Sequence, residues 1–148
     1  MTHVAIVGAG PAGASLAYLL ARRGIPVTLI ERQTDFAREF RGEGLQPAGV
    51  EAMAQMGLSE HLEQIPQVRI SGVEIVRGER LLVRMTPRQK TGSSEGLRLV
   101  SQPVLLEMLV KEASRFPNFK LERGATVREL LLEQERVVGL RADLANGT

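Results

Sequence analysis

A glycine-rich turn near the N-terminus constrains this chain more than any other feature. The turn Gly8-Ala9-Gly10-Pro11-Ala12-Gly13 follows a short apolar run from His3 to Val7. Apolar residues then recur at helical spacing from Ala12 to Arg23, and a second apolar run extends from Val27 to Ile30. Short apolar runs on either side of a helix predict two buried parallel strands joined by a right-handed crossover. The N-terminal segment therefore predicts a βαβ unit.

Each glycine of this turn has a physical role. Gly8 allows a sharp exit from the strand, Gly10 allows the backbone to approach a pyrophosphate, and Gly13 allows the helix to pack against the strand. Pro11 fits an early helical position, where its missing amide costs no helix hydrogen bond. The free amides at the helix start, in the region of Ala12, would hold phosphate oxygens. We therefore expect the turn to bind the pyrophosphate of a dinucleotide.

An acidic residue, Glu31, ends the second apolar run. A carboxylate at this place accepts hydrogen bonds from both hydroxyls of the adenosine ribose. It would repel a 2′-phosphate, which disfavours NADP here, although the neighbouring Arg32 leaves an opening for one. The alternative is a tight turn beside an exposed glutamate, and the order strand, turn, helix, strand and acid argues against it.

The rest of the chain predicts further helices and strands around a loop from Arg32 to Leu45. Helical patterns cover Pro47–Met56 and Gln102–Phe116, and Ser59 caps a short turn that reaches Gln64. Strand patterns cover Gln67–Val76, Arg80–Met85, Leu97–Val100, Phe119–Glu122, Thr126–Gln134 and Val137–Asp143. Gly78 and the pair Glu135-Arg136 mark hairpin turns, and Thr86–Gly96 is the segment expected to be mobile. We predict an α/β, Rossmann-like domain with an antiparallel β meander.

Composition narrows the function classes. A chain of 148 residues suggests one domain, and its net charge of +2 comes from scattered basic residues, so nucleic acid is not the expected partner. There is no cysteine, which excludes thiolate metal sites and redox dithiols, and we expect no metal centre. The sequence has no transmembrane-length apolar stretch and no signal-like leader, from which we expect a cytoplasmic protein. His3 and His61 are expected to be structural. The turn signal Asn146-Gly147 is followed by Thr148 alone, which suggests a chain cut from something longer.

The run Val4 to Arg32, VAIVGAGPAGASLAYLLARRGIPVTLIER, resembles the N-terminal FAD fingerprint of the group A flavoprotein monooxygenases. This family includes para-hydroxybenzoate hydroxylase and the ubiquinone-biosynthesis hydroxylases, whose FAD domain is of the glutathione reductase type. The segment Phe40–Pro47 resembles the family's arginine loop, and AGVEAMAQMGL after it resembles the helix that follows that loop. The helix that starts SQPVLLEML is similar to the one that offers a polar residue to the cofactor. The resemblance covers nearly all of this chain, but less than half of a family member.

The resemblance also implies roles for three more residues. Arg41 would lie near the FAD diphosphate and the flavin, Gln102 would contact the ribityl chain or the pyrophosphate, and the backbone of Val127 would pack against adenine. Each has a plain alternative: a solvated loop arginine, a helix-start residue and an ordinary strand-core residue.

In that family NAD(P)H supplies electrons, and molecular oxygen supplies the atom that hydroxylates an activated ring or a similar small molecule. The family's later Asp-Gly and Gly-Asp motifs and its substrate-binding sheet are absent from these 148 residues. We therefore expect this portion alone to be inactive, and the sequence names no catalytic residue and no oligomeric state. The alternatives are an FAD-dependent reductase or halogenase of the same superfamily, an NAD-binding dehydrogenase, or a nucleotide-binding module without chemistry. A dehydrogenase would place more βα units after Glu31, so the hairpin region Gln67–Met85 favours FAD.

Overall fold

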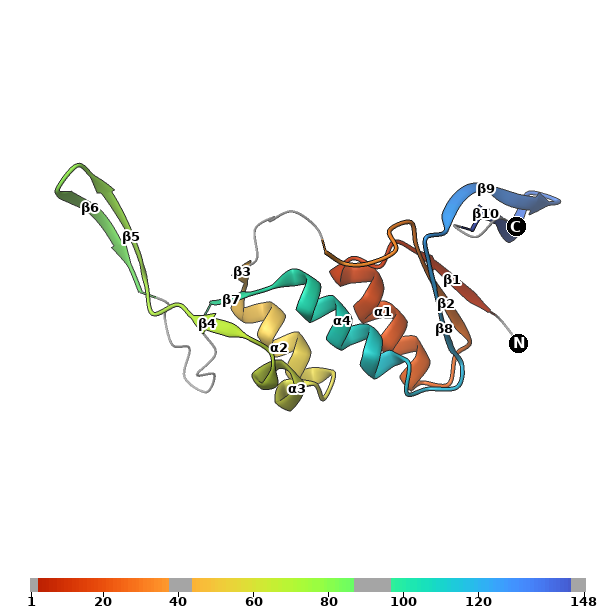
Figure 1. Cartoon of the computed structure of the whole chain (residues 1–148), viewed down its shortest axis with the longest axis horizontal. Coiled ribbons are helices and arrows are strands. Elements are labelled where there is room, and N and C mark those ends of the chain that lie inside the picture. The colour runs from red at the N-terminus through yellow and green to blue at the C-terminus, as the bar shows by residue number, and fades with distance from the viewer. Residues whose placement is uncertain (1–2, 38–43, 87–96, 145–148) are drawn as a thin grey trace. The chain divides into compact units, whose positions relative to one another are not determined.

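The computed structural model describes residues 3–37, 44–86 and 97–144. By its internal contacts the chain forms two compact units. The first unit comprises residues 1–38 and 106–148, and the second comprises residues 39–105. Figure 1 shows the order of their elements along the chain. The expectation of a single domain stays a prediction, and each unit is described by itself.

The first unit contains the predicted βαβ motif. Strand β1 (Val4–Val7), helix α1 (Pro11–Arg22) and strand β2 (Val27–Glu31) follow one another, and the two strands pair in parallel. A third strand, β8 (Phe119–Arg123), pairs in parallel with the other side of β2, which gives the order β1-β2-β8 (Figure 1). Helix α1 packs against all three strands. The prediction of a Rossmann-like α/β fold is therefore confirmed.

Small and apolar side chains explain the close packing of α1. The helix buries Ala14, Ala17 and Ala21, and β2 buries Val27 and Leu29. Alanines let a helix approach a sheet closely, while the β-branched and leucine side chains of the strand fill the space between.

A polar tie joins the end of α1 to the start of β8. The side-chain amide of Asn118 donates to the carbonyl oxygens of Ala21 at 3.0 Å and Ile25 at 2.8 Å. The carbonyl of Asn118 in turn accepts the amide of Val27 at 2.9 Å. These bonds satisfy carbonyls at the helix end, and the last of them lies where β2 and β8 begin to pair.

Two expectations for this sheet were wrong in detail. Strand β1 is parallel, but it is not buried: in the described part of the chain it has a neighbour only in β2, and Val7 is 60% exposed. The segment Phe119–Glu122, expected in the meander, is β8 of the parallel sheet. A strand pattern does not specify the sheet that the strand joins, because pairing depends on distant segments.

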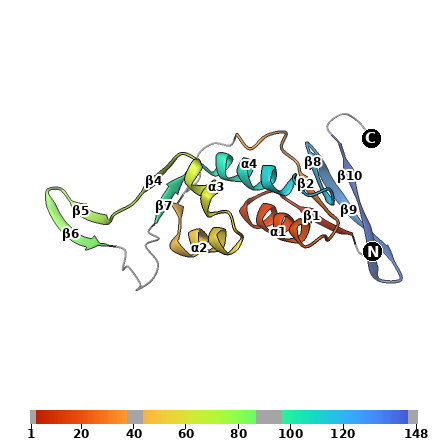
Figure 2. The ribbon, with the colours of Figure 1, turned by 90° about the horizontal axis from the view of Figure 1, so that it is seen from below.

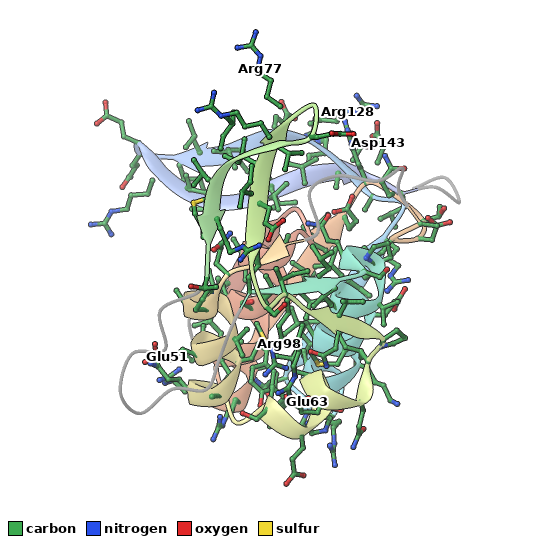
Figure 3. The ribbon with its side chains drawn as sticks, turned by 90° about the vertical axis from the view of Figure 1, so that its left-hand side faces the viewer. Glu51, Glu63, Arg77, Arg98, Arg128 and Asp143 are labelled. Atoms are coloured by element: carbon green, nitrogen blue, oxygen red, sulfur yellow. The ribbon has the colours of Figure 1, made fainter. Side chains whose placement is uncertain are left out.

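The antiparallel part of the first unit is a hairpin of β9 (Thr126–Glu133) and β10 (Arg136–Asp143), visible in Figure 2. Its turn lies at Gln134 and Glu135, one residue earlier than predicted, and both residues have positive φ angles of 46° and 63°. Such a turn matches the twist of a hairpin, and it is usually made by Asn or Gly. The sequence signal was therefore weak. The side chains of Arg128 and Asp143 pair across the strands at 2.7 Å (Figure 3).

The second unit combines short helices with antiparallel strands. Helices α2 (Pro47–Gln55) and α3 (Ser59–Gln64) pack together, and β3 (Gly44–Leu45), β7 (Arg98–Val100) and β4 (Gln67–Arg69) form a sheet in that order. Strands β5 (Val73–Arg77) and β6 (Arg80–Met85) form a separate hairpin around Gly78. Helix α4 (Gln102–Ala113) begins in this unit and continues into the first.

Four sequence expectations need correction here. The predicted strand Gln67–Val76 is two strands, β4 and β5, which belong to different sheets. Leu45, expected in a loop, belongs to β3, and α4 ends three residues before Phe116. Ser59 is the first residue of α3 rather than its cap. Most of Thr86–Gly96 and the pair Asn146-Gly147 lie outside the described residues. Within the described ranges, no helix has the length and apolar character needed to cross a membrane.

Candidate functional site

The predicted glycine turn connects β1 to α1. Gly8 has φ of +98°, in the region that favours glycine, and its amide donates to the carbonyl of Ile30 at 2.7 Å. This bond ties the turn to the end of β2. The turn is thus held at the carboxyl ends of two parallel strands, where ligands bind in open α/β sheets.

Gly13 and Gly10 differ in the space around them. A Cβ atom built on Gly13 would overlap the backbone carbonyl oxygen of Gly8 and would come within 3.3 Å of the Ile6 side chain. A Cβ on Gly10 would meet nothing within 4 Å. Gly13 is therefore required by helix packing, whereas the space beside Gly10 remains open for a ligand to approach the backbone.

The first turn of α1 follows directly after Gly10. Pro11 is the first helical residue, and the first intrahelical bond runs from the amide of Ala14 to the carbonyl of Gly10 at 2.9 Å. The amides of Ala12 and Gly13 precede that bond, so by helix geometry they have no acceptor within the helix. They carry the positive end of the helix dipole, which attracts anions.

Glu31 lies at the end of β2 and is only 4% exposed. One carboxylate oxygen, Oε2, accepts the amide of Ala9 in the glycine turn at 2.8 Å. The other, Oε1, accepts the amide of Gln33 at 3.0 Å. A buried carboxylate needs such donors to offset its desolvation. Glu31 therefore joins the glycine turn to the chain that leaves β2.

A cavity of about 400 Å³ opens at this edge of the sheet, entirely within the first unit. Its lining includes predicted residues from three separate segments, namely Gly8, Gly10, Glu31, Arg32 and Val127. The remaining lining residues are Val7, Ile30, Ala125 and Thr126. The cavity thus combines a carboxylate and a polar turn with apolar strand ends, which suits an adenosine group with its ribose and phosphates.

Sequence reasoning did not predict four of these lining residues: Val7, Ile30, Ala125 and Thr126. Ala125 is buried and its amide donates to the carbonyl of Glu31 at 3.0 Å, which places Thr126 and Val127 beside the cavity. The short turn between β8 and β9 brings them there. The parallel pairing of β8 with β2 is the signal that would have placed Ala125 and Thr126 here, because neither residue belongs to a local sequence motif.

Five predicted residues are not among the described residues that line this cavity: Pro11, Ala12 and Gly13 in the first turn of α1, together with Arg41 and Gln102. Arg41 lies outside the described residues. Gln102 is the first residue of α4, as predicted, and belongs to the second unit. Their roles toward a cofactor stay predictions.

The second unit contains a buried cation of a different kind. Arg98 is 2% exposed, and its Nη1 atom donates to Glu63 at 2.7 Å and to Gln67 at 2.8 Å (Figure 3). Arg69 bonds both oxygens of the same Glu63 carboxylate, at 3.0 and 2.9 Å. Hydrogen bonds from Arg98 first, and Arg69 second, lower the pKa of Glu63 from its usual value of 4.5. We call Glu63, Gln67, Arg69 and Arg98 the Arg98 cluster.

The histidines take part in neither arrangement. The Nε2 atom of His3 lies 2.9 Å from the hydroxyl of Thr28 across the β1–β2 pair. His61 is half-buried within α3. Among the described residues, His, Asp and Glu side chains form no group that could hold a metal ion.

Comparison with known proteins gives a consistent result. A family model described as FAD binding domain matches residues 1–148. Squalene epoxidase 4 of Arabidopsis thaliana is 37% identical over 94% of this chain and 27% of its own length. The 6-methylpretetramide 4-monooxygenase of Streptomyces rimosus is 33% identical over 94% of this chain and 33% of its own length.

The solved structures support the same fold. The crystal structure of p-nitrophenol 4-monooxygenase from Pseudomonas putida DLL-E4 superposes with a TM-score of 0.85 at 19% identity, over 99% of this chain and 38% of that chain. This similarity concerns the fold. The chain spans about a quarter to a third of the length of the curated relatives that it matches.

Proposed function

This chain belongs to the FAD binding domain family, and from that membership we propose that it holds the adenosine diphosphate half of FAD in an FAD-dependent monooxygenase. The single observation that supports this site best is the cavity beside the glycine turn, which Gly8, Gly10 and Glu31 line together. The ADP half of FAD carries hydroxyl donors and phosphate oxygens, which match a carboxylate and helix amides respectively.

In this proposal the ribose hydroxyls would donate to the Glu31 carboxylate, which lines the cavity. The pyrophosphate lies against Gly10 and the first amides of α1, where a side chain on residue 10 would intervene. Arg32 lies at the exposed edge, and Val127 and Thr126 face adenine from the β9 side. The residues present therefore fit the adenosine end of FAD.

When bound, FAD would supply the redox chemistry that the chain's own side chains lack. The role of the described residues is to bind and orient its adenosine end. We propose NADH or NADPH as the external reductant and a small organic molecule as the substrate. The two named relatives act on different molecules, squalene and 6-methylpretetramide. Oxygen insertion, rather than one substrate, is therefore what we carry over to this protein.

The test uses the intact protein with FAD, NADH or NADPH, and molecular oxygen enriched in a heavy isotope. Candidate substrates include isoprenoid alkenes and phenols, and products are identified by mass spectrometry. We expect one heavy oxygen atom in the product. Reductant oxidation with full recovery of hydrogen peroxide and unmodified substrates would contradict a monooxygenase. A halogenated product in the presence of chloride would instead support the halogenase alternative.

A further inference from the structure

One side chain after β2 is buried in a segment that is otherwise exposed. Arg32, Gln33, Thr34 and Asp35 are all exposed, yet Phe36 is 2% exposed. A single buried aromatic residue anchors such a segment, because it removes a large apolar surface from water at one point. The segment Arg32–Phe36 begins at the candidate cavity, so its anchoring bears on the site.

The anchor is completed by Arg123, at the end of β8. Its guanidinium carbon lies 4.4 Å from the centre of the Phe36 ring, a distance at which a cation is attracted to the ring face. Its Nη1 and Nη2 atoms bond the two carboxylate oxygens of Glu107, in α4, at 2.9 and 2.8 Å. This two-point bond fixes the plane of the guanidinium. We call Phe36, Glu107 and Arg123 the Phe36 clamp.

The other end of the segment is held by the residues that follow Arg123. The amide of Gly124 donates to the carbonyl of Gln33 at 3.1 Å, and the amide of Gln33 donates to Glu31 at 3.0 Å. Arg123 is also the partner of Glu31 in the β2–β8 pairing. The clamp therefore holds the segment Arg32–Phe36 at Phe36, and the Glu31 carboxylate holds it at Gln33.

We propose that Arg123, held by Glu107 and lying over Phe36, is a positioning residue that sets Glu31 and Arg32 for the adenosine ribose. The inference rests on the proposed function of the cavity. Without the clamp the segment from Arg32 to Phe36 has more conformations, and the Gln33 amide no longer holds Glu31 in one orientation. Binding must then order the segment, which lowers affinity. Arg123 does not line the cavity itself.

The experiment measures the dissociation constant of ADP by calorimetric titration of the intact protein. We expect Arg123→Met to weaken ADP about tenfold and Arg123→Lys to weaken it about threefold, because lysine keeps a cation near the ring but loses the two-point bond. Phe36→Leu keeps an apolar anchor without a ring face and serves if Arg123→Met does not fold. The matched control is Arg84→Met. Arg84, on β6, pairs with Glu74 on β5, so this substitution breaks an arginine–glutamate pair outside the clamp. ADP affinity should stay within about twofold in that variant.

A double-mutant cycle separates positioning from general stability. If Arg123 acts through Glu31, then Arg123→Met added to Glu31→Gln should weaken ADP by no more than about twofold further. A further tenfold loss would overturn the inference, as would ADP binding unchanged in both Arg123→Met and Phe36→Leu. Failure of the unaltered protein to bind ADP would overturn the proposed function, and the clamp's role with it. Binding by the unaltered protein with no effect of the clamp variants would overturn the inference alone.

Discussion

Glu31 in the first unit and Arg98 in the second are both charged and almost completely buried, yet they are satisfied in different ways. The Glu31 carboxylate accepts two backbone amides from two different loops and lines a cavity. The Arg98 guanidinium is bonded by side chains, those of Glu63 and Gln67. Glu31 thus organises loops around a space for a ligand, whereas Arg98 joins α3 to a three-stranded sheet.

This difference in partners predicts that Glu31 contributes to ligand binding and that Arg98 contributes to the stability of the fold. A buried carboxylate that is held by backbone donors at the edge of a cavity lies where a ligand can approach it. A buried charge that is paired with an opposite charge mainly affects stability, because removing its partner lowers the free energy of unfolding. Changes near Glu31 should therefore affect nucleotide affinity, and changes in the Arg98 cluster should affect folding alone.

Gly13→Ala should have the largest effect, because the added Cβ would overlap the backbone oxygen of Gly8. Backbone atoms of a packed turn cannot shift freely, so we expect a loss of about 3 kcal/mol or more in unfolding free energy, together with loss of ADP binding. Denaturant unfolding and calorimetry measure both. The matched control is Gly49→Ala in α2, where the nearest atom is the mobile Leu45 Cδ1 at 2.6 Å. Equal tolerance of the two substitutions would contradict the packing role of Gly13.

Glu63→Ala should lower the unfolding free energy by about 2 to 3 kcal/mol, since it removes the carboxylate opposite a buried cation. The half-exposed position of Glu63 keeps the effect below that of a fully buried pair. Chemical denaturation measures the loss, and Arg69→Ala, at an exposed position, should cost less than about 1 kcal/mol. ADP affinity should not change in folded Glu63→Ala protein. A weakened affinity would break the separation of binding from stability.

Glu31→Gln should weaken FAD or ADP binding by about 1 to 3 kcal/mol. The amide nitrogen of glutamine cannot accept a hydrogen bond, so one of the two amides, that of Ala9 or that of Gln33, loses its acceptor, and the charge is lost as well. Titration of each ligand measures the change, with Glu63→Gln as the control in the other unit. An unchanged dissociation constant would mean that the carboxylate does not meet the ribose.

The smallest expected effect is a dependence of stability on pH. Because the pKa of Glu63 is lowered in the folded chain, its ion pairs stabilise the fold above the usual value of 4.5. That stabilisation is lost as the pH falls from 4.5 through the lowered value. Thermal unfolding of the protein and of Glu63→Gln between about pH 6 and pH 3 checks this, because the substitution should flatten the acidic slope. An identical slope in both proteins would exclude Glu63 as its source.

Local signals predicted the turn and the acid that line the candidate cavity. The glycine spacing and the acid after the second apolar run specify the turn, helix α1 and the place of Glu31, because each depends on residues near in sequence. The parallel pairing of β8 with β2 depends on segments far apart in the chain. This pairing brings Thr126 to the cavity and Arg123 to Phe36, and no local pattern marks either residue.

The remaining errors also have physical causes. The run Gln67–Val76 has strand character throughout, but it divides between two sheets, because a propensity for extended structure does not choose a partner. The turn at Gln134 and Glu135 lacks the glycine or asparagine that would have marked it. The burial of Arg98 was not predicted for a related reason. A charged residue is expected to be exposed unless its partners in the fold are known.

The central claim is that the cavity beside Glu31 binds the adenosine half of a dinucleotide. Its most direct test is a competition titration of the intact protein with FAD, FMN, NAD and ADP, followed by flavin fluorescence and calorimetry. The account predicts that FAD binds more tightly than FMN, because FMN lacks the ADP part, and that ADP displaces FAD. It also predicts a preference for FAD over NAD. Tight binding of FMN, with no response to FAD or ADP, would contradict the claim.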